Sequence, residues 1–469
     1  MQIDYQWLPA RLQHIYTLLH PYQRDAIFNL KVRQRCMLDA NMGAGKSLMA
    51  LVATMENQPK KVLIACTKNA LYTWQKEIAL WFPEISTDKY FKVAVGTVAQ
   101  RMKAYSEDAL FYLTTYQALN NDVKKRMLPL NAFDTLLVDE AHRSGLRNQK
   151  TVGYATFKII SPLIKYIYYI SGTFISIGPQ QLWPFLNTLA PKKFASYWGF
   201  VNKFCEFIDT PFGKEYIGPQ NSAALDKTLA PHLVRIPRTI TDEQLPPMTR
   251  HCIDIKLNDM QAKVYKQLKT ELWTALANTE KIIVAQNDLS LLTKLRQICV
   301  CPKILGVDDY GIGIDVVAER LEDSDNMHSV IFTPFRSAVP HFKEYLQQRF
   351  PTTTISYLWG GLDMDDVRER ITCFKRTQGI MICSIAFAQS FELNTANKGF
   401  FIGYDWDANN NYQAEARLRR ISSTSSHIDI YYLRHADTIE QHELNLLDQK
   451  VRNVKMTYQT IDQLKSILK

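Results

Sequence analysis

Short apolar runs alternate with helical patterns in two long stretches of the chain, residues 35–175 and the residues after 328. Such runs, bounded by turns and helices, are typical of strands in a parallel sheet, because helices cover both faces of such a sheet. The runs are RCMLDA, KVLIACT, FKVAVGT, ALFYLTTY, TLLVDEAH and YIYYISGT in the first stretch, and HSVIFTPF, TTISYLWG, GIMICSIA, KGFFIGYD and HIDIYYLR in the second. The pattern predicts an α/β chain with two parallel-sheet domains.

The middle of the chain, roughly residues 190–310, is richer in helical periodicity, as in NDMQAKVYKQLKTELWTALAN and LSLLTKLRQICV. Prolines cluster at IPRT and LPPM, which favours an extended connection between domains. The predicted organisation is an N-terminal extension (1–19), a first sheet domain (20–190), a helical insertion and linker (191–254), a second sheet domain (255–445) and a C-terminal helix (446–469).

The charge balance suggests a polyanionic partner without proving one. Lysine and arginine number 56 against 46 aspartates and glutamates, which gives a net charge of +10 and a pI near 9.0. A basic surface favours DNA or RNA, because each neutralised phosphate releases counterions. On charge alone, a merely basic soluble protein is an equally good interpretation. The 46% hydrophobic and 22% charged content indicates a globular rather than a disordered chain.

The eight cysteines are scattered and none forms a CxxC pair, so we expect no zinc site. Cys299 and Cys301 are expected to pack in or beside a core. Dispersed cysteines fit a reducing compartment. The chain does not open on a basic region followed by an apolar stretch, and no apolar run approaches the ~20 residues that span a bilayer. We therefore expect a cytoplasmic protein with no membrane partner.

The strongest local motif is a glycine-rich turn, ANMGAGKS, between the apolar run CMLDA and the helical pattern SLMALVATM. Glycines let backbone amides point at phosphate oxygens, and the helix N-terminus adds a favourable partial charge. Lys46 would reach the β- and γ-phosphates, and the Ser47 hydroxyl would ligate Mg²⁺. The nucleotide-binding candidates are Met42, Gly43, Ala44, Gly45, Lys46 and Ser47. A turn that binds nothing is the weaker alternative, because the strand-loop-helix context is the one that the motif requires.

About a hundred residues later, the run TLLVDEAH ends in two adjacent carboxylates, Asp139 and Glu140. Such a strand delivers both to the carboxyl edge of the sheet, beside the phosphate loop. Asp139 is the candidate to hold Mg²⁺ and Glu140 the candidate general base that polarises the attacking water. Alone, the pair would more often be a solvated turn. Joined to the phosphate loop, it predicts a nucleoside triphosphatase with ATP and Mg²⁺ as cofactors.

The phosphate loop and the DEAH sequence resemble those of superfamily 2 helicases, a resemblance that implies two RecA-like domains with an ATP cleft between them. LHPYQRDAI resembles the family's opening motif, in which Gln23 would read the adenine. VLIACTKNALYTWQKEI resembles motif Ia with the Trp-containing helix of Swi/Snf-type members, which implies that Thr67 and Lys68 lie near a nucleic-acid backbone. Thr115 falls in the segment that matches the family's TTY and receives the same role.

Ser171-Gly172-Thr173 resembles motif III, which links the state of the ATP to domain movement. The resemblance gives His142, Ser171 and Thr173 a coupling role. The following QQLWPFLNTLAP matches the Swi/Snf-type helix that carries ELW. Phe174 stands where that group usually has proline, a departure that weakens the subgroup assignment but not the ATPase.

In the second stretch, HSVIFTPF resembles motif IV and nominates Phe335 and Arg336 as nucleic-acid contacts. QAEARLRRI resembles motif VI, with Gln413 in a coupling role and Arg417 and Arg420 as arginine fingers. Arginines three apart share one helical face, so both are expected to point into the cleft. A basic solvated helix is the alternative. Residues 388–394, AQSFELN, depart from the family's glycine-rich motif V.

The resemblance implies a DNA motor that acts as a monomer. The preferred hypothesis is a helicase that remodels forked or branched DNA, because the compact motor core resembles phage-encoded recombination and replication helicases. A duplex-DNA translocase that displaces proteins is the alternative, followed by an RNA helicase and by a non-enzymatic scaffold. Candidate strand-separating wedges are the aromatic segment 194–212 and the N-terminal stretch with Tyr5 and Trp7. Core packing is the commoner role for such aromatics.

Overall fold

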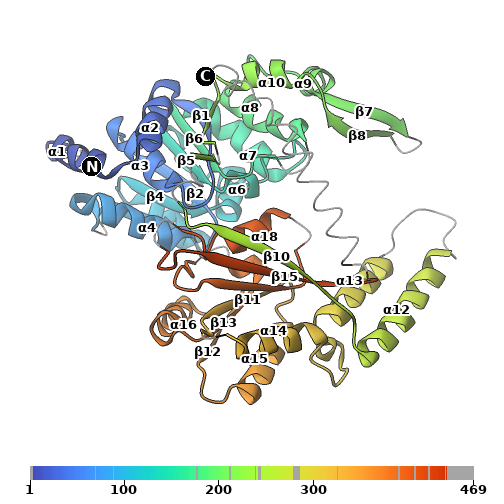
Figure 1. Cartoon of the computed structure of the whole chain (residues 1–469). Coiled ribbons are helices and arrows are strands. Elements are labelled where there is room, and N and C mark those ends of the chain that lie inside the picture. Colours follow the sequence, from blue (N-terminus) through green and yellow to red (C-terminus); the bar gives the residue numbers. More distant parts are fainter. Residues whose placement is uncertain are drawn as a thin grey trace. The chain divides into compact units, whose positions relative to one another are not determined.

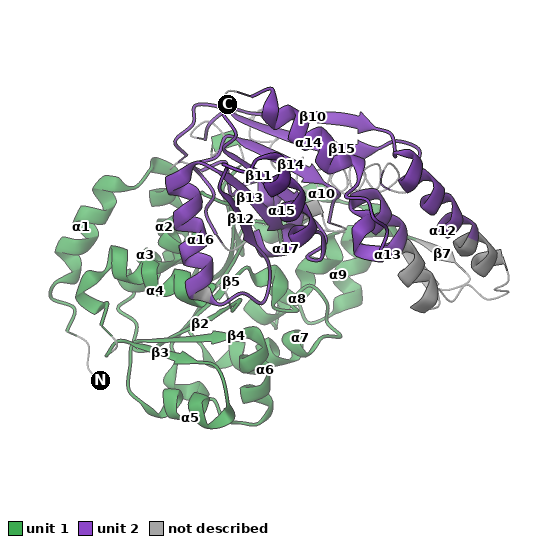
Figure 2. Ribbon diagram, turned by 90° about the horizontal axis from the view of Figure 1, so that it is seen from below, with its two compact units in different colours: residues 1–241, 450–469 green, residues 242–449 purple. Residues whose placement is uncertain are grey.

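The structure is a computed structural model that describes residues 4–440 with short gaps. The gaps are residues 69, 88, 176–177, 211–212, 238, 241–244, 278–285, 325, 389–390, 406–407, 421–422 and 439. The described chain forms two compact units that divide between residues 241 and 242 (Figure 2). The C-terminal helix predicted for 446–469 lies outside the described residues.

The first unit is built on a seven-stranded sheet in the order β3-β4-β2-β5-β6-β1-β9, and every pair of neighbours is parallel (Figure 1). The strands are β1 (Arg35–Asp39), β2 (Val62–Cys66), β3 (Phe91–Ala94), β4 (Phe111–Thr115), β5 (Thr135–Asp139), β6 (Tyr166–Ser171) and β9 (Leu233–Arg235). The first six strands confirm the six apolar runs of the sequence. Since β1, β5 and β6 are neighbours and run in one direction, the segments that follow them meet at one edge of the sheet.

Helices cover both faces of this sheet because alternate strand residues face opposite sides. Leu63 and Ala65 of β2 belong to the hydrophobic core shared with α5–α10, whereas Ile64 and Cys66 belong to the core shared with α1–α4. The helices are α1 (Leu8–Leu18), α2 (Pro21–Arg33), α3 (Lys46–Glu56), α4 (Ala70–Trp81), α5 (Val98–Ser106), α6 (Tyr116–Lys124), α7 (Val152–Ile160), α8 (Trp183–Leu189), α9 (Tyr197–Phe204) and α10 (Ser222–Leu229).

The predicted helical insertion contains strands that the sequence analysis missed. An antiparallel hairpin, β7 (Cys205–Thr210) with β8 (Gly213–Pro219), follows α9 and extends away from it (Figure 1). The short strand β9 then returns to the sheet beside β1. The predicted helical insertion omitted these strands, because CEFIDT, GKEYIGP and LVR are short and contain no long apolar run.

The second unit contains a six-stranded parallel sheet in the order β10-β15-β14-β11-β13-β12. Its strands are β10 (Met248–Ile255), β11 (Ser329–Thr333), β12 (Ile355–Leu358), β13 (Ile380–Ser384), β14 (Lys398–Ile402) and β15 (Ile428–His435). Its helices are α12 (Asp259–Ala277), α13 (Gln286–Val300), α14 (Ile312–Glu322), α15 (Ala338–Arg349), α16 (Met364–Thr377), α17 (Ile385–Ala388) and α18 (Ala408–Glu415). The two parallel-sheet domains predicted from the apolar runs are therefore confirmed.

Strand β10 lies within the residues expected to be linker, so that predicted linker extends too far. Its sequence MTRHCIDI forms no apolar run, since this strand lies at the sheet edge and half of its residues stay exposed. Cys299 and Cys301 are fully buried, as expected. No described helix is both long and apolar enough to cross a membrane.

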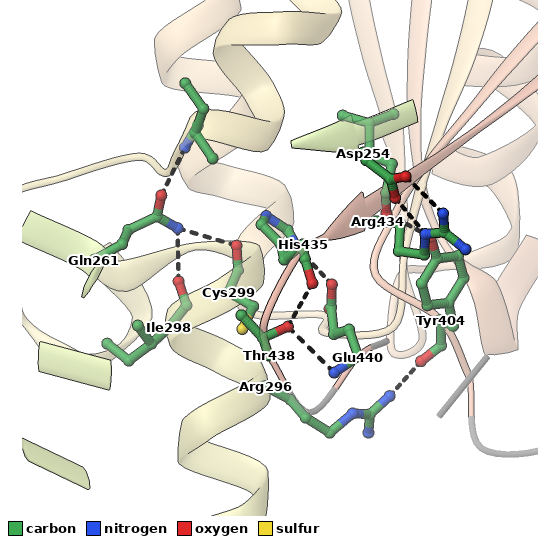
Figure 3. Close-up of polar contacts among 12 residues, drawn as sticks. Asp254, Gln261, Arg296, Ile298, Cys299, Tyr404, Arg434, His435, Thr438 and Glu440 are labelled. Carbon is green, nitrogen blue, oxygen red and sulfur yellow. Dashed lines mark hydrogen bonds and ion pairs between the residues drawn. The ribbon is translucent and has the colours of Figure 1, made fainter. Parts of the chain in front are cut away.

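Buried polar contacts fix the chain beside the carboxyl end of β15 (Figure 3). Arg296 of α13 donates to the carbonyl oxygen of Tyr404, and the Tyr404 hydroxyl donates to the carbonyl oxygen of Leu433 at 2.5 Å. His435, fully buried, pairs with Glu440 just beyond the strand. These contacts hold the loop after β14, which leads into α18, against the end of β15.

Candidate nucleotide site

The glycine-rich turn joins β1 to α3 and has the backbone that a phosphate-binding loop needs. Gly43 and Gly45 have φ angles of 83° and 78°, in the left-handed region that favours glycine. Gly45 caps α3, and the helix begins at Lys46, so its unpaired amides and positive dipole end face the loop. Met42 and Ala44 lie within this loop and Ser47 in the first turn of α3, as the sequence predicted.

Gln23 of α2 packs directly on this loop. Its side-chain Nε2 donates to the carbonyl oxygen of Ala44 at 3.1 Å, and the Tyr22 hydroxyl donates to the same oxygen at 3.2 Å. A Cβ atom at Gly45 would lie 2.4 Å from the Gln23 Nε2, so the glutamine and the glycine fit each other closely. The structure thus brings the predicted adenine-reading residue to the nucleotide loop, and adenine recognition itself stays a prediction.

Asp139 ends β5 and is half-buried, with both carboxylate oxygens engaged. Oδ2 accepts a hydrogen bond from the indole Nε1 of Trp74 at 3.0 Å, and Oδ1 accepts one from the backbone N–H of Glu140 at 3.0 Å. Burial and then the neighbouring Glu140 charge raise the pKa of Asp139, while the Trp74 hydrogen bond and Lys46 oppose that rise. A divalent cation beside this carboxylate would favour its ionised form.

The residues around Asp139 fit a magnesium ion that nucleotide phosphates help to hold. Within the described ranges, no three His, Cys, Asp or Glu side chains gather to form a metal site of their own. Mg²⁺ in such sites takes one or two protein oxygens and completes its shell with phosphates and water, which matches Asp139 with Ser47. Lys46 lies nearby with its Nζ 3.1 Å from the Asn41 carbonyl oxygen. Gly172 lies beside this amine, and a Cβ atom there would come 3.0 Å from the Ala40 carbonyl oxygen, a tight contact that glycine avoids.

Glu140 connects to the predicted coupling residues through a short series of polar contacts. Its Oε2 lies 3.2 Å from the His142 Nδ1, which lies 2.9 Å from the Ser171 Oγ at the end of β6. The same Oγ accepts the backbone N–H of Thr173 at 2.9 Å. Glu140 also has a φ of 48°, a conformation that non-glycine residues adopt at some cost. The structure therefore joins the candidate base, through His142 of its own motif, to Ser171 and Thr173 of a separate motif.

The candidate nucleic-acid residues of the first unit lie at neighbouring strand ends. Thr67 and the exposed Lys68 follow β2, and Thr115 ends β4, paired in register with Cys66. The Thr115 Oγ1 accepts the backbone N–H of Ala118 at 3.3 Å and so caps α6. Their grouping at one edge agrees with the prediction, and their contact with nucleic acid remains untested.

In the second unit, Glu415 anchors the motif VI segment to neighbouring strands. Glu415 at the end of α18 accepts two hydrogen bonds from Arg250 of β10, at 2.8 and 2.7 Å. Its Oε1 also accepts the Tyr432 hydroxyl of β15 at 2.5 Å. Gln413 is buried within α18. These contacts fix the helix that precedes Arg417 to the two strands at one side of the sheet.

The prediction that Arg417 and Arg420 share one helical face is wrong, because α18 ends at Glu415. The chain continues as a tighter turn, in which the Leu418 N–H donates to the Glu415 carbonyl oxygen at 3.0 Å. Beyond it, the backbone N–H of Arg420 donates to the Ser423 Oγ at 2.8 Å, a side-chain contact that replaces the helical one. Arg417 is 7% exposed, so its side chain already lies within the unit.

The motif IV residues lie on aromatic surroundings. The Arg296 guanidinium carbon lies over the Phe335 ring, 5.5 Å from the ring centre. The guanidinium carbon of the exposed Arg336 lies 5.8 Å from the centre of the Trp359 ring. Trp359, which follows β12, therefore joins the candidate nucleic-acid residues, although the sequence analysis placed it in no motif.

A family model described as an SNF2-related domain matches residues 13–304, and a second, described as a helicase conserved C-terminal domain, matches residues 313–422. The first match alone spans more than half of the chain. The chain belongs to the SNF2-related family. It is therefore an enzyme, an ATPase of this nucleic-acid-dependent class with two RecA-like domains.

Curated relatives of this SNF2-related chain are larger proteins. The human DNA annealing helicase and endonuclease ZRANB3 is 25% identical over 462 residues, which are 95% of this chain and 40% of that protein. The CHD3-type chromatin-remodeling factor PICKLE of Arabidopsis thaliana is 24% identical over 506 residues, covering 96% of this chain and 35% of that protein. The chain thus spans about two fifths of the length of the curated relatives that it matches.

A solved structure also covers nearly the whole SNF2-related chain. The Sulfolobus solfataricus SWI2/SNF2 ATPase core in complex with dsDNA matches with 22% identity and a TM-score of 0.43, over 94% of this chain and 93% of that chain.

Besides Trp359, two functional candidates of this SNF2-related enzyme escaped the sequence analysis. The Trp74 indole bonds Asp139 across 65 positions of sequence, and Arg296 contacts both Tyr404 and Phe335. Trp74 was recognised as part of a Trp-containing helix, but not as a partner of Asp139. Arg296 lay in LTKLRQICV, a segment interpreted as a helix alone. Both contacts join residues far apart in the chain, so local pattern gave no signal for them.

Proposed function

We propose that this chain is an ATP-driven DNA helicase or translocase that acts on forked and branched DNA as a monomer. The observation that carries the proposal is the arrangement at one sheet edge of the first unit. There the phosphate loop, the Asp139–Glu140 pair and Ser171 lie on segments that follow β1, β5 and β6. An ATP site whose hydrolytic carboxylate is linked through His142 to a second motif is suited to passing the state of the nucleotide to the rest of the enzyme.

In this mechanism the loop amides and Lys46 bind the phosphates of ATP, and Gln23 reads the adenine. Ser47 and Asp139 would hold Mg²⁺, which when bound supplies charge neutralisation of the phosphates. Glu140 orients and polarises the attacking water. Arg417 and Arg420 of the second domain stabilise charge on the γ-phosphate when they reach the nucleotide, so hydrolysis depends on the two domains coming together.

Translocation requires that each domain grip nucleic acid separately. Thr67, Lys68 and Thr115 are the proposed contacts of the first domain, and Phe335 and Arg336 those of the second. His142, Ser171, Thr173 and Gln413 are proposed to make each grip depend on the nucleotide. Cycles of ATP binding and hydrolysis then move the protein along one strand.

Strand separation needs a wedge beyond the motor, and the structure narrows the candidates. Within the aromatic segment 194–212, Phe194, Phe200 and Phe204 are buried, whereas Trp198 of α9 is 57% exposed. The lysines at 192, 193 and 203 are exposed around it. We assign Trp198 the stacking role, because an exposed indole among cations suits an unpaired base beside phosphates. Replacement of Trp198 by alanine is expected to reduce strand release about tenfold while duplex-stimulated hydrolysis persists, and replacement of Phe28, an exposed aromatic on α2, is the control.

The alternative is a translocase on duplex DNA that displaces proteins without parting strands. The names of the relatives leave both functions open, because one is a DNA annealing helicase and the other a chromatin-remodeling factor. An RNA helicase is the third candidate. A scaffold without activity is disfavoured by the presence of Lys46, Asp139 and Glu140 in a formed site.

The deciding experiment measures ATP hydrolysis by the purified chain without nucleic acid and with single-stranded DNA, duplex DNA, a fork, a four-way junction or RNA. Labelled strands report separation in the same samples, and Glu140→Gln is the inactive control. Stimulation by forks or junctions with strand release supports the helicase. Stimulation by duplex DNA without release favours the translocase, and preference for RNA the third candidate. If no nucleic acid stimulates ATP hydrolysis, then the proposal of a nucleic-acid motor is overturned.

A further inference from the structure

The Trp74 side chain is held rigidly in the core of the first unit. It lies on the buried face of α4 with Leu71 and Ile78, at positions three and four apart, and it is 1% exposed. Helix α4 follows β2, the strand that pairs with β5, and β5 ends at Asp139. The packing of the indole therefore fixes the direction of its single N–H, which lies 3.0 Å from the Asp139 Oδ2.

An indole N–H is a suitable partner for a carboxylate that must also hold a cation. It donates and never accepts, so it cannot bind the metal itself. It is neutral, so it does not add a positive charge that would compete with the metal, as a lysine or arginine would. The backbone N–H of Glu140 holds the other oxygen, Oδ1, and two donors from different elements prevent rotation of the carboxylate. Each oxygen keeps a further lone pair for a ligand.

We propose that Trp74 is a positioning residue, which orients the Asp139 carboxylate for the magnesium–nucleotide complex. Loss of the indole N–H leaves Oδ2 without this donor, so the carboxylate turns and holds the cation less well. Partners that orient metal ligands typically contribute ten- to a hundredfold to metal affinity. The inference rests on the proposed ATP site, but not on any action upon DNA.

The chain provides a matched control in Trp183 of α8. This indole is also buried, at 4% exposed, and packs in the core on the opposite face of the same sheet. Its Nε1 has no hydrogen-bond partner among the described residues. Replacement of either tryptophan by phenylalanine removes similar volume, but the Trp74 substitution alone removes a hydrogen bond to a candidate metal ligand.

The test uses the full chain without nucleic acid and measures binding of a fluorescent ADP analogue, with and without Mg²⁺. For Trp74→Phe we expect the Mg²⁺ concentration at half-maximal enhancement of binding to rise about tenfold, while the affinity without Mg²⁺ stays unchanged. Trp183→Phe should change neither value. Unchanged Mg²⁺ dependence in Trp74→Phe overturns the inference, and so does equal weakening with and without Mg²⁺, which indicates a collapsed site.

A double-mutant comparison with Asp139→Asn separates positioning from general packing. If Trp74 acts through Asp139, then Trp74→Phe adds no further change in Mg²⁺ dependence once Asp139 is replaced. Additive effects of the two substitutions would contradict the proposal. Because DNA is absent from these measurements, they can succeed when the proposed motor function fails, and the reverse also holds.

Discussion

The carboxyl edges of the two sheets hold their candidate residues in different ways. In the first unit the candidates contact one another: Gln23 packs on Gly45, and Glu140, His142 and Ser171 form a connected series. In the second unit, Glu415, which is outside the candidate set, holds motif VI in place by its bonds to Arg250 and Tyr432. At the edge of the first sheet the candidate residues thus form a connected site. At the edge of the second sheet they lie on a segment that Glu415 anchors to the strands.

The difference suggests a division of labour. A connected site keeps its geometry before the nucleotide arrives, which is what a phosphate and metal site requires. The anchored segment of the second unit has only to place Arg417 at the nucleotide during hydrolysis, and its contacts with β10 and β15 keep it rigid. Function at the edge of the first sheet should therefore be sensitive to substitutions of the candidate residues. Function at the edge of the second sheet should also be sensitive to substitution of Glu415.

The largest expected effect is that of Arg417→Ala on hydrolysis. Loss of an arginine that stabilises the transferring phosphate should lower kcat about a thousandfold, roughly 4 kcal/mol, with nucleotide affinity nearly unchanged. Steady-state hydrolysis and fluorescent-nucleotide binding measure the two quantities. The neighbouring Arg419, which donates to the Pro246 carbonyl oxygen at 2.7 Å, is the control, and Arg419→Ala should retain most of kcat. A loss below tenfold for Arg417→Ala would remove the arginine from the reaction.

The anchor of the second edge is tested by Glu415→Gln. The Glu415 side chain is 3% exposed, whereas that of Arg250 is 45% exposed, so solvent screens part of the pair. We expect the free energy of unfolding of the second unit to fall by about 2 kcal/mol in denaturant titrations. Asp254→Asn is the matched control, since Asp254 pairs with Arg434 between the same strands but at the surface (Figure 3). If both substitutions lower the free energy of unfolding equally, then Glu415 stabilises the second unit no more than a surface ion pair does.

The sequence predicted the parts of the fold that are apolar on both faces. All eleven apolar runs became strands, and nine of them are central in their sheets, where a parallel strand must bury both of its sides. It missed β10 at the sheet edge, the β7–β8 hairpin, whose strands mix polar and apolar residues, and the three-residue β9. It also extended the motif VI helix over Arg417, since spacing alone did not reveal that the backbone of Arg420 bonds to Ser423.

The candidate site was predicted in its residues but not in its connections. Lys46 and Asp139 were found because local motifs carry them. The bond from Trp74 to Asp139 and the contact of His142 with Ser171 join separate motifs, and only the order of strands in the sheet brings them together. A local pattern contains no information on which strand lies beside which.

The connected series of the first edge is tested by Ser171→Ala. This change removes the Oγ that joins His142 to the Thr173 backbone, and one lost hydrogen bond corresponds to about a tenfold effect. We expect the stimulation of hydrolysis by DNA to fall about tenfold, with less change in unstimulated hydrolysis. Ser161→Ala is the control, because Ser161 is equally buried but precedes β6 and contacts Tyr169 inside that strand rather than residues at its carboxyl end. Equal losses with and without DNA would make Ser171 structural.

The smallest expected effect concerns β9, which flanks the strand that carries the phosphate loop. His232 precedes β9, and its carbonyl oxygen accepts the backbone N–H of Met37 in β1 at 2.8 Å. Burial, with the nearby charges of Lys193 and Arg33, lowers the pKa of His232 to about 4. The unfolded chain, with an ordinary histidine pKa of about 6.5, therefore takes up the proton first as the pH falls.

The stability that neutral His232 contributes should be complete above about pH 6.5 and should be lost as the pH falls toward 4. Because the ring is partly exposed, we expect a loss of about 1 kcal/mol over that window. His232→Phe should remove this loss, since the Nε2 has no hydrogen-bond partner in the described chain and the ring packs edge-on against Phe194. Denaturant titrations of both proteins near pH 7.5 and near pH 5 measure the difference. If His232→Phe loses the same unfolding free energy between the two pH values, then other groups cause the acid sensitivity. Acid would then weaken β9 no more than the rest of the first sheet.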